Sequence, residues 1–429
     1  MDSDFLKALG GSALDFFKTS GKSFGERYKP LNEYITLLEK HKVFFTANRV
    51  ITSLVTSNVD AEISGSSKRN YLNFSSQDYL GLAQSEEVKN AAHEAIDNYG
   101  VHTSSSPVLS GRNTLTEKLE NKLADITGTE QSLLFPVGWG ACFGAIAALV
   151  NHSDHILLDA LSHNSLQVAS SYSTDNIHKF RHNDVDHLDQ LLIRLREKEP
   201  KSGIFVVIEG LYSMNSDMPD LKSVLELTKK YEAILIVDIA HDFGAMGKKG
   251  LGILETIEGD DLSNVVLVGA FSKSFATNGG FVAGPACIRK QLSIFGPTYT
   301  FSNGISPVQC AIALKCSDII FSGKGDELRS KLNDNIQCAR REFNSRGFVT
   351  NGIPSPIVPV NIGNEDLARI IGRENIRNGL MTNIAEFPAV PKGKAIFRFQ
   401  LMSTHEHTQI IEAAEIISQG RKEAQLILQ

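Results

Sequence analysis

Residues 233–238, Ala-Ile-Leu-Ile-Val-Asp, hold the pattern that decides the fold: five consecutive apolar residues followed at once by a carboxylate. An unbroken apolar run is typical of a strand covered on both faces, because a strand with one wet face alternates apolar and polar residues. Ligands bind at the carboxyl ends of such strands in open α/β sheets. We therefore predict that Asp238 lies at the edge of a buried sheet, where it can contact a ligand.

Four further runs share this apolar character: Leu133–Phe135, His155–Leu158, Ile204–Ile208 and Val265–Val268. Segments with leucines at helical spacing and charges on the opposite side lie between them, at 184–198 and 221–231. This alternation predicts an α/β fold with a mostly parallel sheet. We expect three parts: an N-terminal segment at 1–95, a central sheet domain at 96–322 and a smaller C-terminal domain at 323–429.

The composition disfavours several classes of protein. The chain has 43 Lys and Arg against 49 Asp and Glu, a net charge of −6, which favours binding to neither nucleic acid nor an anionic membrane. None of its five cysteines forms a C-x-x-C pair, so we expect no disulfide framework and no metal site. The longest apolar stretch, about 141–150, is half a membrane span. We expect a soluble, cytoplasmic protein.

Polar residues or glycines follow each predicted strand. They form five groups: Gly138-Trp139-Gly140, Asp159 to His163, Glu209 to Ser213, Asp238 to His241, and Ser272-Lys273. Because the carboxyl ends of parallel strands meet at one edge of a sheet, these groups are expected to converge on one ligand site.

One interpretation of this site is dinucleotide binding. Gly138-x-Gly140 opens a predicted helix, and Asp159, 21 residues after Gly138, ends the next strand as a ribose-binding acid would. The third glycine is Gly144, however, which makes the motif one residue too long. This interpretation also gives no role to Asp238 or Lys273.

A second interpretation is binding of pyridoxal 5′-phosphate (PLP). This cofactor requires a lysine that forms a Schiff base, a carboxylate beside the pyridine nitrogen, and backbone amides at a helix N-terminus for the phosphate. Lys273, Asp238 and the glycine turn at 138–140 supply all three.

Two longer motifs surround Asp238 and Lys273. The first is Asp238-Ile-Ala-His241-Asp-Phe-Gly244-x-x-Gly247-x-x-Gly250, and the second runs from Gly269 through Lys273 to Gly284. Both resemble motifs of the α-oxoamine synthases, PLP enzymes of fold type I, and the second is closest to the bacterial serine palmitoyltransferase branch. Further matches include Tyr79-Leu80-Gly81-Leu82 and Pro388-Ala389-Val390-Pro391, so that the resemblance spans about residues 70–410.

The resemblance implies a role for each matching residue. Lys273 would hold the cofactor and later remove the α-proton of the substrate, and Asp238 would pair with the pyridine nitrogen. His241 would bond the phenolic oxygen of the cofactor, and His163 would stack on its ring. The implied phosphate ligands are Gly138, Trp139, Ser213, Ser272 and, from a neighbouring subunit, Thr300 or Ser302.

The residues that the resemblance assigns to the substrate are less regular. Arg398 would bind the amino-acid carboxylate through a two-pronged contact. Gln77 stands where the family has an asparagine, Cys142 replaces another asparagine, and Ala270 replaces a threonine. Glu386 stands where some serine palmitoyltransferases have a mobile arginine. These departures cluster around the substrate rather than around Lys273.

The resemblance implies that a small L-amino acid condenses with an acyl thioester, carried by coenzyme A or an acyl-carrier protein, with loss of CO₂. It also implies a homodimer with shared active sites. Lys273 and Asp238 are equally compatible with a PLP-dependent aminotransferase or C–C lyase. A non-catalytic partner subunit is disfavoured, because such subunits typically lack the lysine. The sequence does not name the amino acid or the acyl chain.

Overall fold

A computed structural model of the chain describes residues 3–16, 20–43, 49–63 and 68–429. The chain forms two compact units, which we call the central unit (78–213 and 217–330) and the terminal unit (1–77, 214–216 and 331–429). Each is described by itself.

The described part of the central unit contains a seven-stranded sheet in the order β4-β10-β9-β8-β7-β5-β6. The strands are β4 (Gln131–Phe135), β5 (His155–Asp159), β6 (Ile177–Phe180), β7 (Ile204–Glu209), β8 (Ile234–Asp238), β9 (Val265–Ala270) and β10 (Gly280–Gly284). Pairing is parallel from β6 to β9, whereas β10 runs antiparallel to both of its neighbours. This sheet confirms the predicted α/β fold with a mostly parallel sheet.

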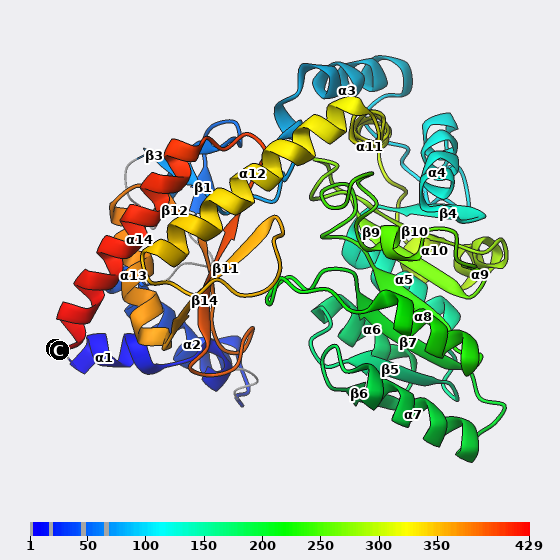
Figure 1. Cartoon of the computed structure of the whole chain (residues 1–429), viewed down its shortest axis with the longest axis horizontal. Helices are drawn as coiled ribbons and strands as arrows, with labels where there is room; N and C mark the ends of the chain where they lie inside the picture. Colours follow the sequence, from blue (N-terminus) through cyan, green and yellow to red (C-terminus); the bar gives the residue numbers. More distant parts are fainter. Residues whose placement is uncertain (1–2, 17–19, 44–48, 64–67) are drawn as a thin grey trace. The chain divides into compact units, whose positions relative to one another are not determined.

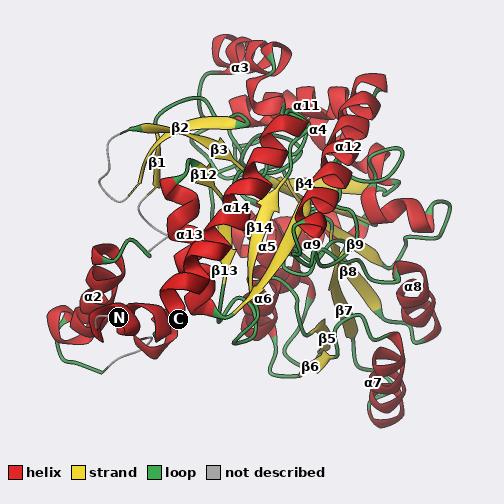
Figure 2. Cartoon of the chain, turned by 60° about the vertical axis from the view of Figure 1, so that its left-hand side comes forward, coloured by secondary structure: helices red, strands yellow, loops and turns green. Residues whose placement is uncertain are grey.

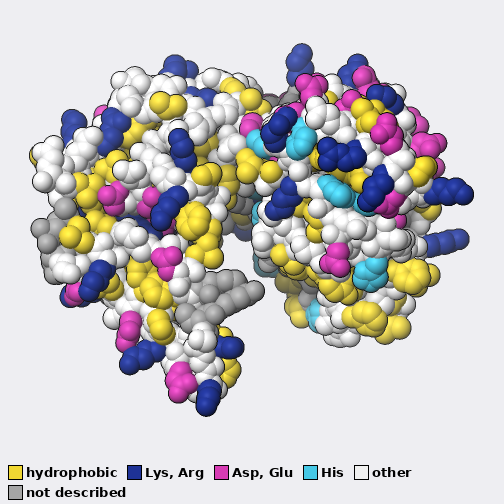
Figure 3. Space-filling view, turned by 90° about the horizontal axis from the view of Figure 1, so that it is seen from below, with side chains coloured by type: hydrophobic (Ala, Val, Ile, Leu, Met, Phe, Trp, Pro, Cys, Tyr) yellow, Lys and Arg dark blue, Asp and Glu magenta, His cyan; other side chains and the backbone are white. Residues whose placement is uncertain are grey.

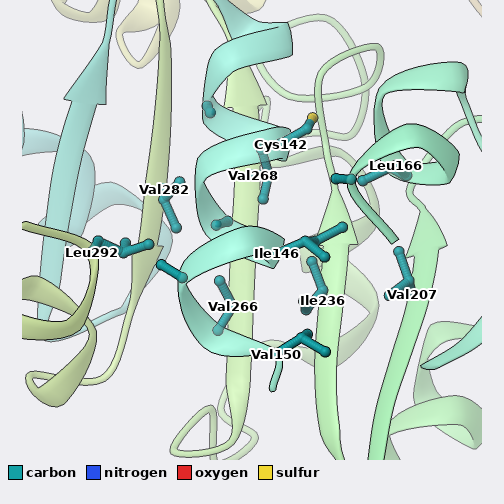
Figure 4. Packing of buried hydrophobic residues seen from close by; sticks show 14 of the residues in the cluster. Cys142, Ile146, Val150, Leu166, Val207, Ile236, Val266, Val268, Val282 and Leu292 are labelled. Atoms are coloured by element: carbon teal, nitrogen blue, oxygen red, sulfur yellow. The ribbon is translucent and has the colours of Figure 1, made fainter. Parts of the chain in front are cut away.

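Helices cover both faces of this sheet, as Figures 1 and 2 show: α5 (Gly138–Leu149) and α6 (Asn164–Ser173) lie on one face, and α7 (Val185–Lys198) and α8 (Leu221–Lys230) on the other. Under α5, the side chains of Ile146 and Val150 pack next to Ile236 of β8 (Figure 4). The neighbouring residues of the same strand, Leu235 and Val237, point to the opposite face and are also fully buried. Burial on both faces explains the unbroken apolar runs.

The sequence analysis did not predict two strands of this sheet. β6 reads Ile-His-Lys-Phe and lies at the sheet edge, where only part of a strand needs to be apolar. β10 begins and ends with glycine, so it has few side chains that carry a strand signal. The central unit also contains α3 (Glu86–Tyr99), α4 (Thr114–Thr127), α9 (Cys287–Phe295), α10 (Pro297–Thr300) and α11 (Pro307–Ile320).

The described terminal unit contains two small sheets. One has the order β1-β2-β3-β12, formed by β1 (Arg49–Ile51), β2 (Asn58–Ile63), β3 (Arg69–Asn73) and β12 (Leu380–Met381). The other has the order β11-β14-β13, formed by β11 (Ile357–Gly363), β14 (Ala395–Gln400) and β13 (Asn383–Ala385). Its helices are α1 (Ser3–Gly10), α2 (Phe24–Lys40), α13 (Glu365–Arg377) and α14 (His407–Leu428), and the second half of α12 (Gly323–Ser345) also belongs to it.

The limits of the compact units differ from the predicted segment limits of 95 and 322. The first change of unit follows Gln77, and α3 belongs to the central unit, where it packs on α11. The last change of unit lies inside α12, between Ser330 and Lys331. Such packing between distant segments leaves no mark in local composition. The division of the chain into three domains at 1–95, 96–322 and 323–429 remains a prediction.

Charged side chains of both signs are interspersed on the surface. On the face shown in Figure 3, Lys and Arg lie among Asp and Glu rather than forming one extended basic area. Among the described residues, no helix is long and apolar enough to cross a membrane. The same residues include no group of three or more His, Cys, Asp or Glu side chains placed to hold a metal ion.

The buried guanidinium of Arg369 on α13 connects three parts of the terminal unit. It forms a two-pronged ion pair with Glu386, at 2.9 Å from Nε and 2.7 Å from Nη2. Its Nη1 donates to the carbonyls of Ala8 and Leu9, at 2.8 and 2.9 Å, and to the Tyr34 hydroxyl at 3.1 Å. A cation is favourable at the C-terminal end of α1 because the helix dipole is negative there. Arg369 thus binds the N-terminal helices to the loop that contains Glu386.

We predict that Arg369→Met lowers the free energy of unfolding by ~2–3 kcal/mol, because it leaves the Glu386 carboxylate and two α1 carbonyls without their partner. Urea denaturation followed by circular dichroism measures this loss. The double variant Arg369→Met/Glu386→Met should lose less than the sum of the two single losses, since removing both charges leaves neither one unpaired. Lys324→Met, which removes an exposed ion pair with Glu87, is the control and should cost under ~1 kcal/mol. Equal stability of Arg369→Met and wild type would contradict this account.

Candidate active site

A cavity of about 260 Å³ lies at the carboxyl ends of the central strands. Its lining includes residues that end or follow five strands: Gly138 and Trp139 after β4, His163 after β5, Glu209 at the end of β7, Asp238 and His241 at β8, and Ser272 and Lys273 after β9. The sheet thus brings together seven of the residues to which the resemblance assigns a role, with Glu209 beside them.

Asp238 is buried, with 8% of its surface exposed, and both of its carboxylate oxygens are engaged. Oδ1 accepts the N–H of Ala240 at 3.0 Å, and Oδ2 lies 3.4 Å from the Cys142 thiol. Burial, together with the Asp238 charge, holds the pKa of the Cys142 thiol well above its ordinary value. The thiol therefore stays protonated and donates to the carboxylate. A carboxylate has further lone pairs that remain available to a cationic ligand.

The N-terminus of α5 forms another wall of this cavity. Val137 is its N-cap residue and provides no side-chain cap, so the first N–H groups of the helix, which have no intrahelical acceptors, are available to an anion. A Cβ atom at Gly138 would lie 2.5 Å from the Cβ of Ala270. Glycine is therefore required where the helix start meets the end of β9.

Lys273 lies in a tight loop between β9 and β10. The loop is closed by hydrogen bonds from Phe271 N–H to the Gly279 carbonyl at 3.0 Å and from Thr277 N–H to the Phe271 carbonyl at 3.1 Å. Phe271 and Phe275 are fully buried and anchor the loop beneath the surface. Lys273 is only half-buried and lines the cavity. The loop thus presents the amine from a fixed backbone.

The two histidines of the cavity are each oriented by a neighbour. His163 is the N-cap residue of α6, and its Nδ1 lies 2.7 Å from the Ser165 hydroxyl. The backbone N–H of His163 donates to Oε1 of Glu209. The Nδ1 of His241 lies 2.9 Å from the hydroxyl of Tyr79, which is fully buried.

A second group of charges lies beside the cavity. His182 lies between two carboxylates, with Nδ1 at 2.9 Å from Asp159 and Nε2 at 3.0 Å from Asp217. Its pKa is raised to about 9; burial alone would lower it, but the two carboxylates prevail. Asp159 also accepts the N–H groups of Leu161 and Asn183, at 2.8 and 3.0 Å. This cluster fixes the loop that leads to His163.

Five predicted site residues do not line this cavity. Ser213 is half-buried in the segment after β7, Thr300 donates to the Ser293 carbonyl at 3.2 Å, and Ser302 donates to the Asn303 carbonyl at 3.2 Å. Gln77 and Arg398 belong to the terminal unit. The roles assigned to these five residues remain predictions.

Arg398 lies on β14 and lines a cavity of about 510 Å³ whose lining residues all belong to the terminal unit. The lining also includes Arg49, whose pKa burial lowers to about 10. Glu386 is part of the same wall, but its carboxylate is held by Arg369. The negative charge of Glu386 is therefore neutralised by the Arg369 guanidinium.

The sequence analysis assigned no functional role to Glu209, Cys142, Ser165 or Tyr79, all of which lie in or next to the site. Glu209 carried a usable signal, since it ends an apolar run in the same way as Asp238 does. Cys142 and Ser165 are inside or near the starts of helices, and their contacts depend on tertiary packing. No local pattern marks them.

The dinucleotide interpretation is wrong, because the structure does not offer its acidic residue to a ligand. The Asp159 carboxylate is occupied by His182 and by backbone N–H groups, and Asp159 does not line the cavity.

Comparison with known proteins assigns the chain to a family. The model of the family "Aminotransferase class I and II" matches residues 69–417. The chain belongs to this family. The aminotransferase class I/II relatives include serine palmitoyltransferase of Sphingobacterium spiritivorum, 33% identical over 87% of this chain and 92% of that protein. They also include 8-amino-7-oxononanoate synthase of Citrifermentans bemidjiense, 32% identical over 81% of this chain and 88% of that protein.

Both relatives are α-oxoamine synthases, and the chain belongs to this group within the family, which confirms the resemblance seen in the sequence. A solved serine palmitoyltransferase from Sphingomonas wittichii has the same fold, with a TM-score of 0.85 and 28% identity over 94% of this chain and 99% of that one. The likeness confirms the fold that the resemblance implied, which is that of the PLP enzymes of fold type I.

We predict that His182→Gln destabilises this α-oxoamine synthase in a pH-dependent way. The pKa of His182 is raised above its unfolded value, so its stabilisation is complete below about pH 6.5 and disappears as the pH rises through about 9. The variant should therefore unfold more easily by on the order of 3 kcal/mol at pH 6, and by much less at pH 10. Chemical denaturation at several pH values measures this difference. His93→Gln, on the exposed surface of α3, is the control, and a difference for His182→Gln that does not change with pH would contradict the prediction.

Proposed function

We propose that the chain is a PLP-dependent acyltransferase that condenses a small L-amino acid with an acyl thioester, acyl-CoA in the first instance, and releases CO₂ and the thiol to give an α-aminoketone. The observation that carries this proposal is the cavity that joins Lys273, Asp238 and the N-terminus of α5 at the sheet edge. Membership of the α-oxoamine synthases supports the reaction class, because serine palmitoyltransferases and 8-amino-7-oxononanoate synthases are its relatives.

The residues of the cavity fit PLP. The uncapped N–H groups of α5 suit its phosphate, and the buried Asp238 carboxylate suits a protonated ring nitrogen. Lys273 lines the same cavity. When bound, PLP supplies an electron sink that stabilises negative charge on the α-carbon of the amino acid.

Each side chain then has a defined task. Lys273 would hold the cofactor, and its Nζ would take the proton from the α-carbon of the amino acid. The Asp238 carboxylate would face the ring nitrogen, and the Cys142 thiol helps to orient it. His163 lines one side of the cavity, and His241, whose Nδ1 is held by Tyr79, would bond the phenolic oxygen of PLP.

Arg398 binds the carboxylate of the amino acid. Its support is the resemblance together with its place on the wall of a cavity that also contains Arg49, so that two guanidinium groups favour an anion there. The Glu386 carboxylate does not offset them, because Arg369 neutralises it.

PLP binding can be followed with Trp139, the only tryptophan of the chain, which lines the cavity and is 44% exposed. Titration of cofactor-free protein with PLP should quench its emission to saturation, and borohydride should then attach the cofactor to the tryptic peptide that contains Lys273. Lys273→Ala should lose the covalent product, whereas Lys290→Ala, an exposed lysine of the same unit, should keep it. Absence of a modified Lys273 peptide in wild type would contradict the assignment.

The acyltransferase reaction predicts thiol release from acyl-CoA that requires both the amino acid and PLP. Arg398→Ala should raise KM for the amino acid by about 10–100-fold, with a smaller change in kcat, because it removes a charge-assisted contact to the substrate. Arg341→Ala, exposed on α12, is the control. Formation of a keto acid without thiol release would instead indicate an aminotransferase, and fragmentation of the amino acid a C–C lyase.

The resemblance also supports a homodimer in which Thr300 or Ser302 contributes to the PLP phosphate of the neighbouring subunit. Mixing Lys273→Ala with Thr300→Val/Ser302→Ala should then restore activity, since one hybrid site contains no substitution. Two inactive proteins that stay inactive after subunit exchange would contradict shared sites.

A further inference from the structure

Glu209 is an acidic residue in the cavity to which neither the resemblance nor the proposed chemistry gives a task. It is the last residue of β7, only 3% of its surface is exposed, and it lines the cavity. In the β7–β8 register it lies directly beside Asp238. Two carboxyl groups therefore lie side by side at the floor of the site.

The Glu209 carboxyl connects its strand to the loop after β5. Its Oε1 accepts the backbone N–H of His163, across 46 residues of chain. His163 is the residue at which the loop after β5 turns into α6, and its side chain is exposed to the cavity. The direction of its ring therefore depends on how its backbone is held, and Glu209 holds it from the neighbouring strand.

The electrostatic setting suits a neutral acceptor. Burial, with the charge of Asp238 as the next cause, holds the pKa of Glu209 well above its ordinary value. A neutral carboxyl still accepts a hydrogen bond through its carbonyl oxygen, without adding a second negative charge beside Asp238. Burying such a polar group costs stability unless it is paired, and the His163 N–H provides a hydrogen-bond partner.

We propose that Glu209 is a positioning residue of this active site: its carboxyl oxygen fixes the backbone of His163 and thereby holds the imidazole at the wall of the cofactor cavity. The role in cofactor binding rests on the proposed function, whereas the contact itself does not.

The contact is tested first without cofactor, by hydrogen–deuterium exchange of the peptide that spans residues 160–166. Glu209→Leu removes the acceptor, so the His163 amide should exchange about tenfold faster or more. Glu209→Gln keeps a carbonyl oxygen and cannot ionise, so its exchange should remain close to that of wild type. Asp154→Leu is the matched control: Asp154 is also buried and accepts one backbone N–H, from Asn151 at 2.8 Å, but it precedes β5 at the opposite edge of the sheet. Equal exchange in wild type and Glu209→Leu would overturn the proposal.

The effect on the site is tested by PLP affinity, measured through Trp139 emission in wild type, Glu209→Gln, Glu209→Leu, His163→Ala and the double variant Glu209→Leu/His163→Ala. Glu209→Leu and His163→Ala should each weaken PLP binding by about tenfold, and the double variant should bind no more weakly than the weaker single variant, because Glu209 acts through His163. Losses that multiply, or a Glu209→Gln variant as impaired as Glu209→Leu, would overturn the proposal. Failure of wild type to bind PLP would instead contradict the proposed function.

Discussion

The carboxyl ends of parallel strands meet at one edge of a sheet, and the chemistry of this chain depends on that constraint. β8 and β9 bring Asp238 and Lys273 to the same cavity although 35 residues separate them, and β7 adds Glu209 beside Asp238. The one antiparallel strand of the described central sheet, β10, closes the loop that presents Lys273. Burial of the sheet on both faces keeps these strand ends fixed, and hydrogen bonds within the loop after β9 then fix Lys273.

Much of this arrangement is predictable from the sequence, because a strand that is buried on both faces consists almost entirely of apolar residues. The runs ending at Phe135, Ile208, Val237 and Val268 are unbroken for that reason, and the polar residues or glycines that come within a few positions after them mark the site. Contacts between distant segments leave no such trace. The pairing of Glu386 with Arg369, the hydrogen bond from His163 to Glu209 and the position of His182 between Asp159 and Asp217 all require the folded chain.

The structure also shows what two residues that depart from the family pattern contact. Cys142, in place of an asparagine, donates its thiol to Asp238 and stays protonated because it is buried. Glu386, in place of a mobile arginine, is bound by Arg369 and thereby connected to the N-terminal helices. The first departure acts on the cofactor side, through the residue proposed to face the ring nitrogen. The second adds a carboxylate to the terminal unit together with the cation that neutralises it.

The central claim is that the sheet edge holds PLP with its ring nitrogen kept protonated by the neighbouring Asp238 carboxylate. The most direct measurement is the ¹⁵N chemical shift of ring-labelled PLP bound to the protein, recorded between pH 6 and 9. The account predicts the shift of a protonated pyridine nitrogen throughout that range in wild type, and its loss in Asp238→Asn. A neutral pyridine shift in wild type, or a protonated one that persists in Asp238→Asn, would contradict it.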